Sequence, residues 1–208
     1  SIIMSNNSED IFLEDIKSIA NELEEFYDEL EGKTVLIAGG KGFLGTYFTS
    51  VLTKINETLS KPMKIIVLDS LITSKDKKDD VNQNIEFLEQ DISKHFEIGG
   101  NIDYIIHAAS IASPPTYRKF PIKTVDVNYQ GTKNLLEIAK EKKVRSMLFL
   151  SSSEIYGDPE IFPTPESYVG KVSCTGPRAC YDESKRFAET ISILYFQQYK
   201  IPIKIARP

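Results

Sequence analysis

A triplet of glycines at positions 39, 42 and 45 constrains the fold more than any other feature of these 208 residues. The triplet lies between a short apolar β run, residues 34–38, and a segment expected to be helical to about residue 56. Glycine permits the tight turn at such a junction and lets backbone N–H groups approach a pyrophosphate at the start of the helix. The strand–turn–helix context, which the motif requires, is met. The sequence therefore predicts a cradle for the phosphates of a dinucleotide.

The rest of the chain alternates apolar strands with helices. Further strands are expected at residues 63–69, 85–88, 103–108, 146–151 and 202–206, and helices at about 121–143 and 180–199. Such alternation is typical of βαβ units, with a parallel sheet and helices on both faces. The predicted fold class is α/β, a Rossmann-type doubly wound parallel sheet over residues 32–208. Residues 73–84 are polar and charged and are expected to form a solvated loop.

Residues 1–31 precede this pattern and are predicted to form an N-terminal extension. Apolar residues recur at helical spacing among acidic ones, so an amphipathic helix is expected over residues 9–31, ended by Gly32. We expect this helix to pack on the side of the domain. Binding of a partner is the alternative interpretation.

The composition excludes several classes of protein. With 25 Lys+Arg against 30 Asp+Glu the net charge is −5, and 41% of residues are hydrophobic, so a disordered chain is excluded. The negative charge argues against nucleic acid as a partner. Cys174 and Cys180 fit neither a disulfide framework nor a zinc pattern, so we expect reduced thiols, no metal site and a cytoplasmic setting. No apolar run approaches the roughly 20 residues of a membrane span, so no membrane partner is expected.

Acidic and small residues follow the predicted strands where a dinucleotide would lie. Asp69 ends the second strand, where a carboxylate would accept hydrogen bonds from a ribose and repel a 2′-phosphate, which favours NAD over NADP. Asp91 could bond the adenine amino group. Ala108, Ala109 and Ser110 follow the fourth strand and are small enough for a cofactor to lie against the backbone. His107 is interpreted as a packed, hydrogen-bonded residue rather than a catalyst.

Tyr181 and Lys185 are four residues apart, so a helix would place them on one face. To act as a base near neutral pH, a tyrosine must lower its pKa by roughly three units, or about 4 kcal/mol. A neighbouring ammonium would supply part of that. Ser152, after the fifth strand, could bond a substrate hydroxyl and relay its proton to Tyr181.

The chain resembles the extended short-chain dehydrogenase/reductase family over residues 32–208. The resemblance rests on the glycine triplet, Asp69, residues 107–109, Asn128, Ser152 and the Tyr181/Lys185 pair. It implies NAD as cofactor. The predicted cofactor contacts are Gly39, Gly42, Phe43, Leu44, Gly45, Asp69, Asp91, Ile92, Ala108, Ala109, Ser110, Thr124, Ser151, Tyr181 and Lys185.

Residues 112–115, 121–124, 153–159 and 176–183 are similar to one group within that family, the UDP-glucuronate decarboxylases. This implies that Tyr181, assisted by Ser152, takes the proton of the sugar C4 hydroxyl while NAD accepts the C4 hydride. The 4-keto acid then loses carbon dioxide and the hydride returns. Glu154 is implied to orient the sugar and to help in proton handling at C5. The predicted catalytic residues are Ser152, Glu154, Tyr181 and Lys185.

Other reactions stay open. Related 4,6-dehydratases carry Asp-Glu where this chain has Ser153-Glu154, and serine is a poor general acid, so elimination is disfavoured. A 4-epimerase or 4,6-dehydratase is the alternative to a carboxy-lyase, and a non-catalytic NAD-binding protein is a further one.

The resemblance also implies partners. The substrate is a nucleotide sugar, with a UDP-sugar favoured, and a homodimer is implied through helices at about 129–143 and 181–199. Family members continue into a small sugar-nucleotide-binding domain with an Arg for the substrate carboxylate, and most of that domain is expected to be absent here. The predicted substrate contacts are Ser113, Tyr117, Lys123, Asn128, Ser152, Ser153, Glu154 and Tyr181.

Overall fold

The protein folds around one sheet of parallel strands. The computed structural model describes residues 2–71 and 82–208, and the side chains from residue 7 onward. Six strands pair in the order β3-β2-β1-β4-β5-β6, all in parallel register. Their bounds are β1 Thr34–Ala38, β2 Lys64–Asp69, β3 Ile85–Glu89, β4 Tyr104–His107, β5 Ser146–Leu150 and β6 Ile203–Ala206. The predicted strands are confirmed to within two residues at their ends.

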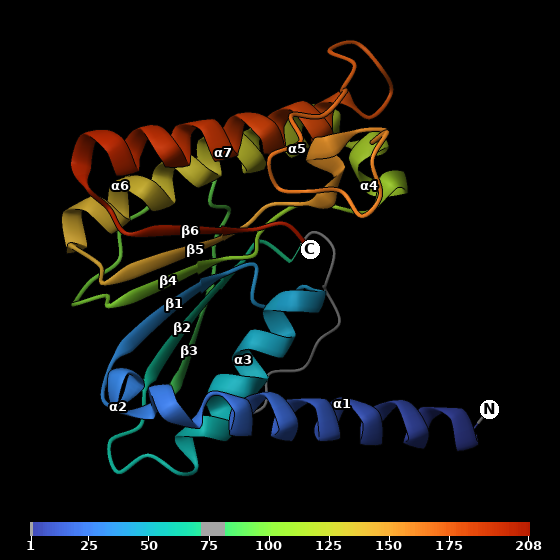
Figure 1. The fold of residues 1–208 in the computed structure, drawn as a ribbon. Helices are drawn as coiled ribbons and strands as arrows, with labels where there is room; N and C mark the ends of the chain where they lie inside the picture. Colours follow the sequence, from blue (N-terminus) through green and yellow to red (C-terminus); the bar gives the residue numbers. More distant parts are fainter. Residues whose placement is uncertain (1, 72–81) are drawn as a thin grey trace.

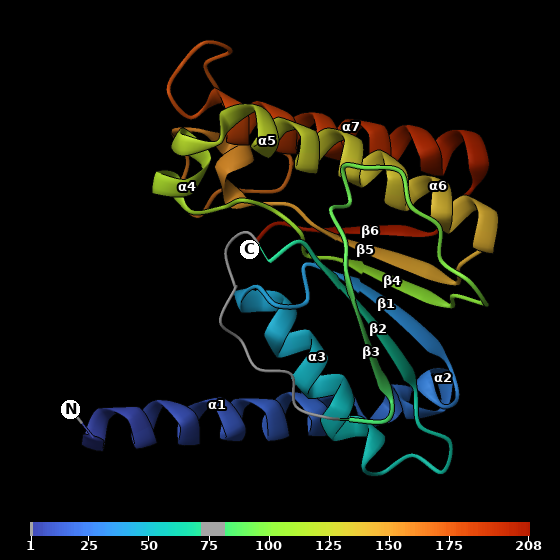
Figure 2. The ribbon, with the colours of Figure 1, turned by 180° about the vertical axis from the view of Figure 1, so that it is seen from behind.

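Helices cover both faces of the sheet, as expected for a doubly wound fold (Figures 1 and 2). On one face lie α4 Pro114–Lys119, α5 Pro121–Asp126, the π-helical segment η2 Val127–Gly131, α6 Thr132–Lys142 and α7 Ala179–Tyr199. On the other face lie α1 Ile2–Glu22 and α3 Phe43–Asn56. Strand order reverses between β1 and β4, and ligands of such sheets bind beyond the carboxyl ends of the strands at this point. The predicted α/β fold class is therefore confirmed.

The N-terminal helix differs from the expectation. α1 already begins at Ile2, and it ends at Glu22 rather than continuing to residue 31. A 3₁₀ turn, η1 Glu24–Phe26, separates it from the short helix α2 Tyr27–Leu30. The Tyr27 hydroxyl donates to the Ala20 carbonyl at 2.8 Å and folds this end back on α1. As expected, the helix packs on the domain, with Ile16 and Ala20 buried in the core beneath α3.

The helix expected over residues 121–143 contains a π-helical segment. A methyl group at Gly131 would lie 2.7 Å from the Ile92 side chain, so glycine allows this segment to pack closely on the β3–β4 connection. Such π segments are frequent at functional sites, and this one carries the buried Asn128. Helix α4 was not expected, although prolines in its first turn are a recognised starting signal.

The remaining observations concern the predicted loop, the length and polarity of the helices, and the two cysteines. Most of the predicted loop at residues 73–84 lies outside the described residues. Among the described helices, none is long and apolar enough to cross a membrane. Cys174 and Cys180 are free, as expected.

Candidate active site

A cleft opens at the carboxyl ends of β1, β2, β3 and β4, where the fold predicts a ligand. It is formed by the turn before α3 and by the residues that follow each strand. Most of the predicted cofactor contacts line it: Gly39, Gly42, Asp69, Asp91, Ile92, Ala108, Ala109 and Ser110. The structure therefore brings these predicted contacts together in one cleft.

The glycine turn is closed by backbone packing at two positions. Gly39 has φ +79°, and a methyl group there would lie 2.6 Å from the Ala109 backbone. A methyl group at Gly45 would lie 2.0 Å from the Gly39 carbonyl oxygen. Only glycine allows α3 to start this close to β1, and the N–H groups of its first turn favour a phosphate. Phe43 and Leu44 lie in that turn with exposed side chains.

Asp69 fixes the shape of the turn. Its carboxylate oxygens accept hydrogen bonds from the Lys41 N–H at 2.9 Å and the Leu71 N–H at 2.8 Å. An ionised carboxylate has about four acceptor positions, so both oxygens can still accept a ribose hydroxyl. The predicted role is compatible with these contacts.

Asp91 and Lys123, predicted for cofactor and substrate respectively, form an ion pair. The Ser93 hydroxyl and N–H also donate to Asp91, at 2.6 and 3.0 Å. Burial acts to raise the pKa of this carboxyl, but the hydrogen bonds from Lys123 and Ser93 hold it below its usual value. The structure thus joins two residues that the sequence analysis had assigned to different ligands.

Tyr181 lies at the buried centre of the site. Burial raises the pKa of its phenol, and the nearby hydroxyls of Ser152 and Ser110 lower it only in part. The Tyr117 ring stacks on it at 5.3 Å between ring centroids. The net direction of this pKa shift is upward, and Lys185 is not among its causes.

Lys185 occupies the same face of α7, one turn later. Its side chain is buried, and Nζ donates to the Leu150 carbonyl at 2.8 Å and lies 5.0 Å from the Phe149 ring centre. Burial lowers the pKa of this ammonium from 10.5 to about 7. The lysine is therefore a group that loses its charge easily.

His107 is packed and neutral, as interpreted from the sequence. Its Nδ1 accepts from the Ala109 N–H at 3.3 Å, so Nε2 carries the proton toward the Thr132 hydroxyl at 2.8 Å. Burial and the nearby Lys185 charge hold the pKa of the imidazole well below its usual value.

Asn128 links the segment after β4 to α7. Its Oδ1 accepts from Ser110 at 3.0 Å and its Nδ2 donates to Ser184 at 2.9 Å. Sequence analysis missed Ser184, although its place between Tyr181 and Lys185 was a signal. Asn128 and Tyr117 were predicted to contact substrate and are both buried.

The residues after β5 form the rim of the site. Ser152 caps the 3₁₀ turn η3 Ser153–Tyr156 by accepting from the Glu154 N–H at 3.1 Å. The Glu154 carboxylate pairs with Arg178, and Ser153 is exposed. Two predicted contacts lie apart from this rim. Ser113 is exposed before α4, and Thr124 is buried with its hydroxyl bonded to Phe120.

These residues fit a dinucleotide. The Ser151 hydroxyl is buried and has no hydrogen-bond partner in the described part of the chain. Buried polar groups are normally bonded, so a polar atom of a ligand would satisfy it. A dinucleotide would be held by the glycine turn and Asp69 at one end, and by Ser151 and Lys185 at the other.

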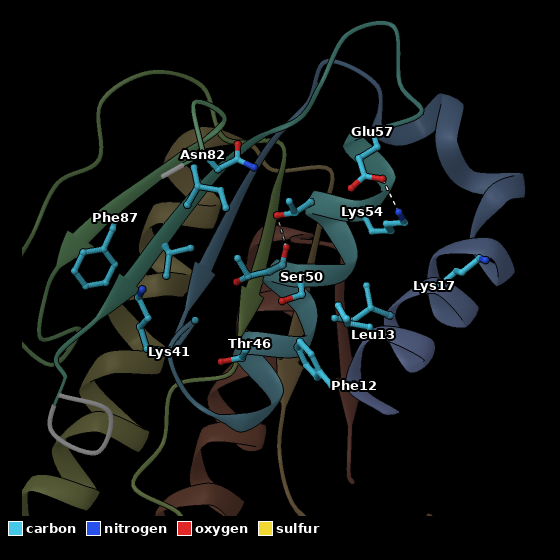
Figure 3. Close-up of a pocket in the computed structure, with 16 residues that line it drawn as sticks. Phe12, Leu13, Lys17, Lys41, Thr46, Ser50, Lys54, Glu57, Asn82 and Phe87 are labelled. Atoms are coloured by element: carbon cyan, nitrogen blue, oxygen red, sulfur yellow. Dashed lines mark hydrogen bonds and ion pairs between the residues drawn. The ribbon is translucent and has the colours of Figure 1, made fainter. Parts of the chain in front are cut away.

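A second hollow lies on the face of the sheet that α1 and α3 cover, between these two helices and strands β2 and β3 (Figure 3). It has a volume of about 790 Å³, and Phe12 and Phe87 contribute to its lining. Lys54 and Glu57 form an ion pair at its edge, at 2.5 Å. Its described lining includes no residue predicted for cofactor, substrate or catalysis.

The chain is similar to known proteins of one family. The model of the family described as "NAD dependent epimerase/dehydratase family" matches residues 35–208 of the chain. The chain is 39% identical over 186 residues to UDP-glucuronic acid decarboxylase 1 of Xenopus tropicalis, a match over 88% of this chain and 42% of that protein. It is 42% identical over 176 residues to UDP-glucuronic acid decarboxylase 5 of Arabidopsis thaliana, over 83% and 49%. A solved structure of the UDP-glucose 4-epimerase of Thermus thermophilus in complex with NAD matches with TM-score 0.65 and 26% identity, over 84% of this chain and 54% of that chain.

The chain thus spans less than half the length of these curated relatives. The family description names NAD, the cofactor predicted from the glycine triplet and Asp69. The match over residues 35–208 also confirms the resemblance found in the sequence. The chain belongs to the NAD-dependent epimerase/dehydratase family.

Proposed function

We propose that this chain is the NAD-binding and catalytic part of a nucleotide-sugar carboxy-lyase that converts UDP-glucuronate to UDP-xylose. The observation that carries the proposal is the buried Tyr181 phenol beside the Ser152 hydroxyl, with Lys185 one turn away on the same helix. This arrangement can take a proton from a sugar hydroxyl at the carboxyl ends of the strands. The names of the 39–42% identical relatives support UDP-glucuronate as the substrate.

The chemistry follows from proton handling by these side chains. Ser152 would bond the C4 hydroxyl and Tyr181 would accept its proton. Bound NAD supplies the hydride acceptor at C4. Because a ketone at C4 makes the sugar a β-keto acid, the bond to the carboxylate breaks and its electron pair moves toward the C4 oxygen. Tyr181, now protonated, would stabilise that oxygen, and a proton added at C5 completes the loss of carbon dioxide. Return of the hydride to C4, with the proton that Tyr181 took transferred back to the C4 oxygen, would then give UDP-xylose and leave the cofactor oxidised.

The rim favours this reaction over elimination. Loss of water from C6 would need a general acid there, and Ser153 is a poor one because its pKa lies far from neutrality. Glu154 is the only carboxylate within η3, and we propose that it orients the sugar and serves C5. Decarboxylation needs no acid at C6.

A 4-epimerase is the second candidate. It is favoured by the shared fold of the Thermus thermophilus UDP-glucose 4-epimerase. Epimerisation needs the same Tyr181 and the same redox cofactor but leaves the mass of the sugar unchanged. The two candidates therefore differ in one measurable quantity.

The test uses the longest natural form of the protein. We would incubate it with NAD and UDP-glucuronate and weigh the sugar nucleotide by mass spectrometry. We expect a loss equal to carbon dioxide, and we expect Tyr181→Phe to abolish it while NAD affinity, measured by calorimetry, stays the same. An unchanged mass with UDP-glucuronate, but C4 inversion of UDP-glucose, would establish the epimerase. A protein that binds NAD and turns over neither sugar would be the non-catalytic alternative.

We also propose a homodimer formed through α6 and α7. Four apolar side chains of α7 are 43–52% exposed, at Ile193, Leu194, Phe196 and Tyr199. Such a stripe on an exposed helix is typical of an interface. Light scattering should give twice the mass of the chain, and Leu194→Glu should give a monomer. A monomeric wild type at high concentration would contradict the proposal.

A further inference from the structure

The short turn η3 brings the rim of the site into place. It has four residues, Ser153–Tyr156, and is capped by Ser152, whose hydroxyl accepts from the Glu154 N–H and lies beside the Tyr181 phenol. A single 3₁₀ turn has too few internal hydrogen bonds to hold itself. The position of Ser152 on Tyr181 therefore depends on contacts from outside η3.

Three arginines hold three consecutive residues of this turn. Arg178 pairs with the Glu154 carboxylate. Arg186 donates from Nη1 to the Ile155 carbonyl at 2.6 Å, and Arg207 donates from Nη1 to the Tyr156 hydroxyl at 2.9 Å. The three contacts hold different groups of the turn: the Glu154 carboxylate, the Ile155 backbone carbonyl and the Tyr156 hydroxyl.

All three arginines are anchored on α7. Arg178 occupies the position directly before α7, and Arg186 lies on the helix about two turns from its start. Arg207 follows β6, but its guanidinium forms two hydrogen bonds with Glu189 of α7, at 2.8 and 3.0 Å. Paired bonds of this kind fix geometry as well as adding energy. The pair is shielded, with the Glu189 and Arg207 side chains 12% and 26% exposed.

The same helix carries the reacting groups. Tyr181 and Lys185 lie on α7, directly before Arg186 and Glu189. Arg186 also donates to the Val169 carbonyl at 2.8 Å and so holds the segment that returns from η3. One rigid helix therefore sets both the phenol and the turn that brings Ser152 to it.

We propose that Arg186 and Arg207 are positioning residues that lock η3 onto α7 and thereby hold the Ser152 hydroxyl on the Tyr181 phenol during the oxidation step. This inference rests on the proposed function, which assigns Ser152 and Tyr181 to that step. Neither arginine belongs to the described lining of the cofactor cleft, which comes from β1 to β4 and Val127. Their loss should therefore slow the chemistry without weakening NAD binding.

The first test compares Arg186→Gln with Glu183→Gln in the natural full-length protein. Glu183 lies 3.9 Å from Arg186 on the exposed side of α7, and such a pair contributes little. Arg186→Gln should lower kcat about tenfold, the effect of losing a charged hydrogen bond. NAD affinity should change less than about twofold. Glu183→Gln should leave both as in the wild type. An unchanged kcat in Arg186→Gln, or an equal loss in NAD affinity, would overturn the inference.

A double-mutant cycle separates positioning from mere stability. If Arg186 acts through Ser152, Arg186→Gln should have no further effect on kcat in a Ser152→Ala background. Independent, multiplying effects would overturn the proposal. Should Arg186→Gln fail to fold, Arg186→Lys serves instead, because an ammonium can still reach one of the two carbonyls. The lysine variant should show a smaller loss of kcat in the same direction, and no loss would overturn the proposal.

A readout without substrate distinguishes this inference from the proposed function. The Glu154 N–H is bonded to the Ser152 hydroxyl, so its hydrogen exchange reports how η3 is held. Exchange at Glu154 should be faster in Arg186→Gln and unchanged in Glu183→Gln. Faster exchange in Arg186→Gln, in a protein that turns over no nucleotide sugar, would refute the proposed function but support the holding of η3 by Arg186. An active enzyme in which Arg186→Gln changes neither the exchange nor kcat would refute the positioning role of Arg186 but leave the proposed function standing.

Discussion

Replacing Lys185 by Met tests how the buried centre is charged. Burial lowers the pKa of this side chain from 10.5 to about 7, which corresponds to about 5 kcal/mol at 1.36 kcal/mol per pH unit. Between these two values the unfolded chain binds the proton and the folded chain does not. The free energy of unfolding of the wild type should therefore rise with pH in this window. Lys185→Met lacks this titration.

The assay is urea unfolding of the ligand-free chain, followed by circular dichroism at several pH values. Relative to Lys185→Met, the wild type should gain about 3 kcal/mol between about pH 7.5 and 9.5. The variant also leaves the Leu150 carbonyl without its donor. The loss of this hydrogen bond costs about 1–3 kcal/mol at every pH. It therefore shifts the difference in unfolding free energy between wild type and variant without changing how that difference depends on pH. Only the slope is the test.

The control is Lys94→Met, which removes an exposed lysine. Its difference from the wild type should be flat over the same range. A flat difference for Lys185→Met as well would refute the reasoning, because it would mean that the folded chain keeps the Lys185 proton. Water or a mobile Nζ would then have to solvate the ammonium.

Three further perturbations follow from the cleft. Gly45→Ala should abolish NAD binding in calorimetry and lower the melting temperature, because its methyl group would lie 2.0 Å from the Gly39 carbonyl oxygen. Asp91 has a lowered pKa beside Lys123, so it stabilises the fold above its ordinary pKa, and this is lost as pH falls. In urea unfolding, the free energy of unfolding should thus fall less between about pH 6 and 3 in Lys123→Met than in the wild type. Asp69→Asn should bind NADP more tightly than the wild type does, since the charge facing a 2′-phosphate is removed.

Much of the fold could be predicted because local patterns and tertiary structure agree. Strand β1 is a buried apolar run next to a turn that only glycine can form, so its position had one solution. The end of α1 could not be placed, because the break near Leu23 depends on a tertiary bond from Tyr27 to Ala20. The π segment also escaped prediction, since it depends on Gly131 meeting Ile92 from another strand connection.

The sequence could place Tyr181 and Lys185 relative to each other, but it could not predict how other candidate site residues pair. Periodicity placed Tyr181 and Lys185 on one face of a helix, and the structure has them there. The sequence could not show that Lys123 meets Asp91, because the two lie on segments more than thirty positions apart. Nor could it show burial, which reverses the expected direction of the pKa of Tyr181. Distances along the chain carry no information about desolvation.

Burial acts on the three central groups in one direction. It raises the pKa of the Tyr181 phenol, lowers that of the Lys185 ammonium and keeps His107 neutral. Each shift favours the uncharged form, so the ligand-free centre resists forming a phenolate beside an ammonium. A base of this kind gains strength only when a bound molecule adds positive charge or hydrogen bonds near the phenol. Under the proposed function, Tyr181 would therefore become a base only after the cleft is filled, and a positioned Ser152 would contribute part of that change.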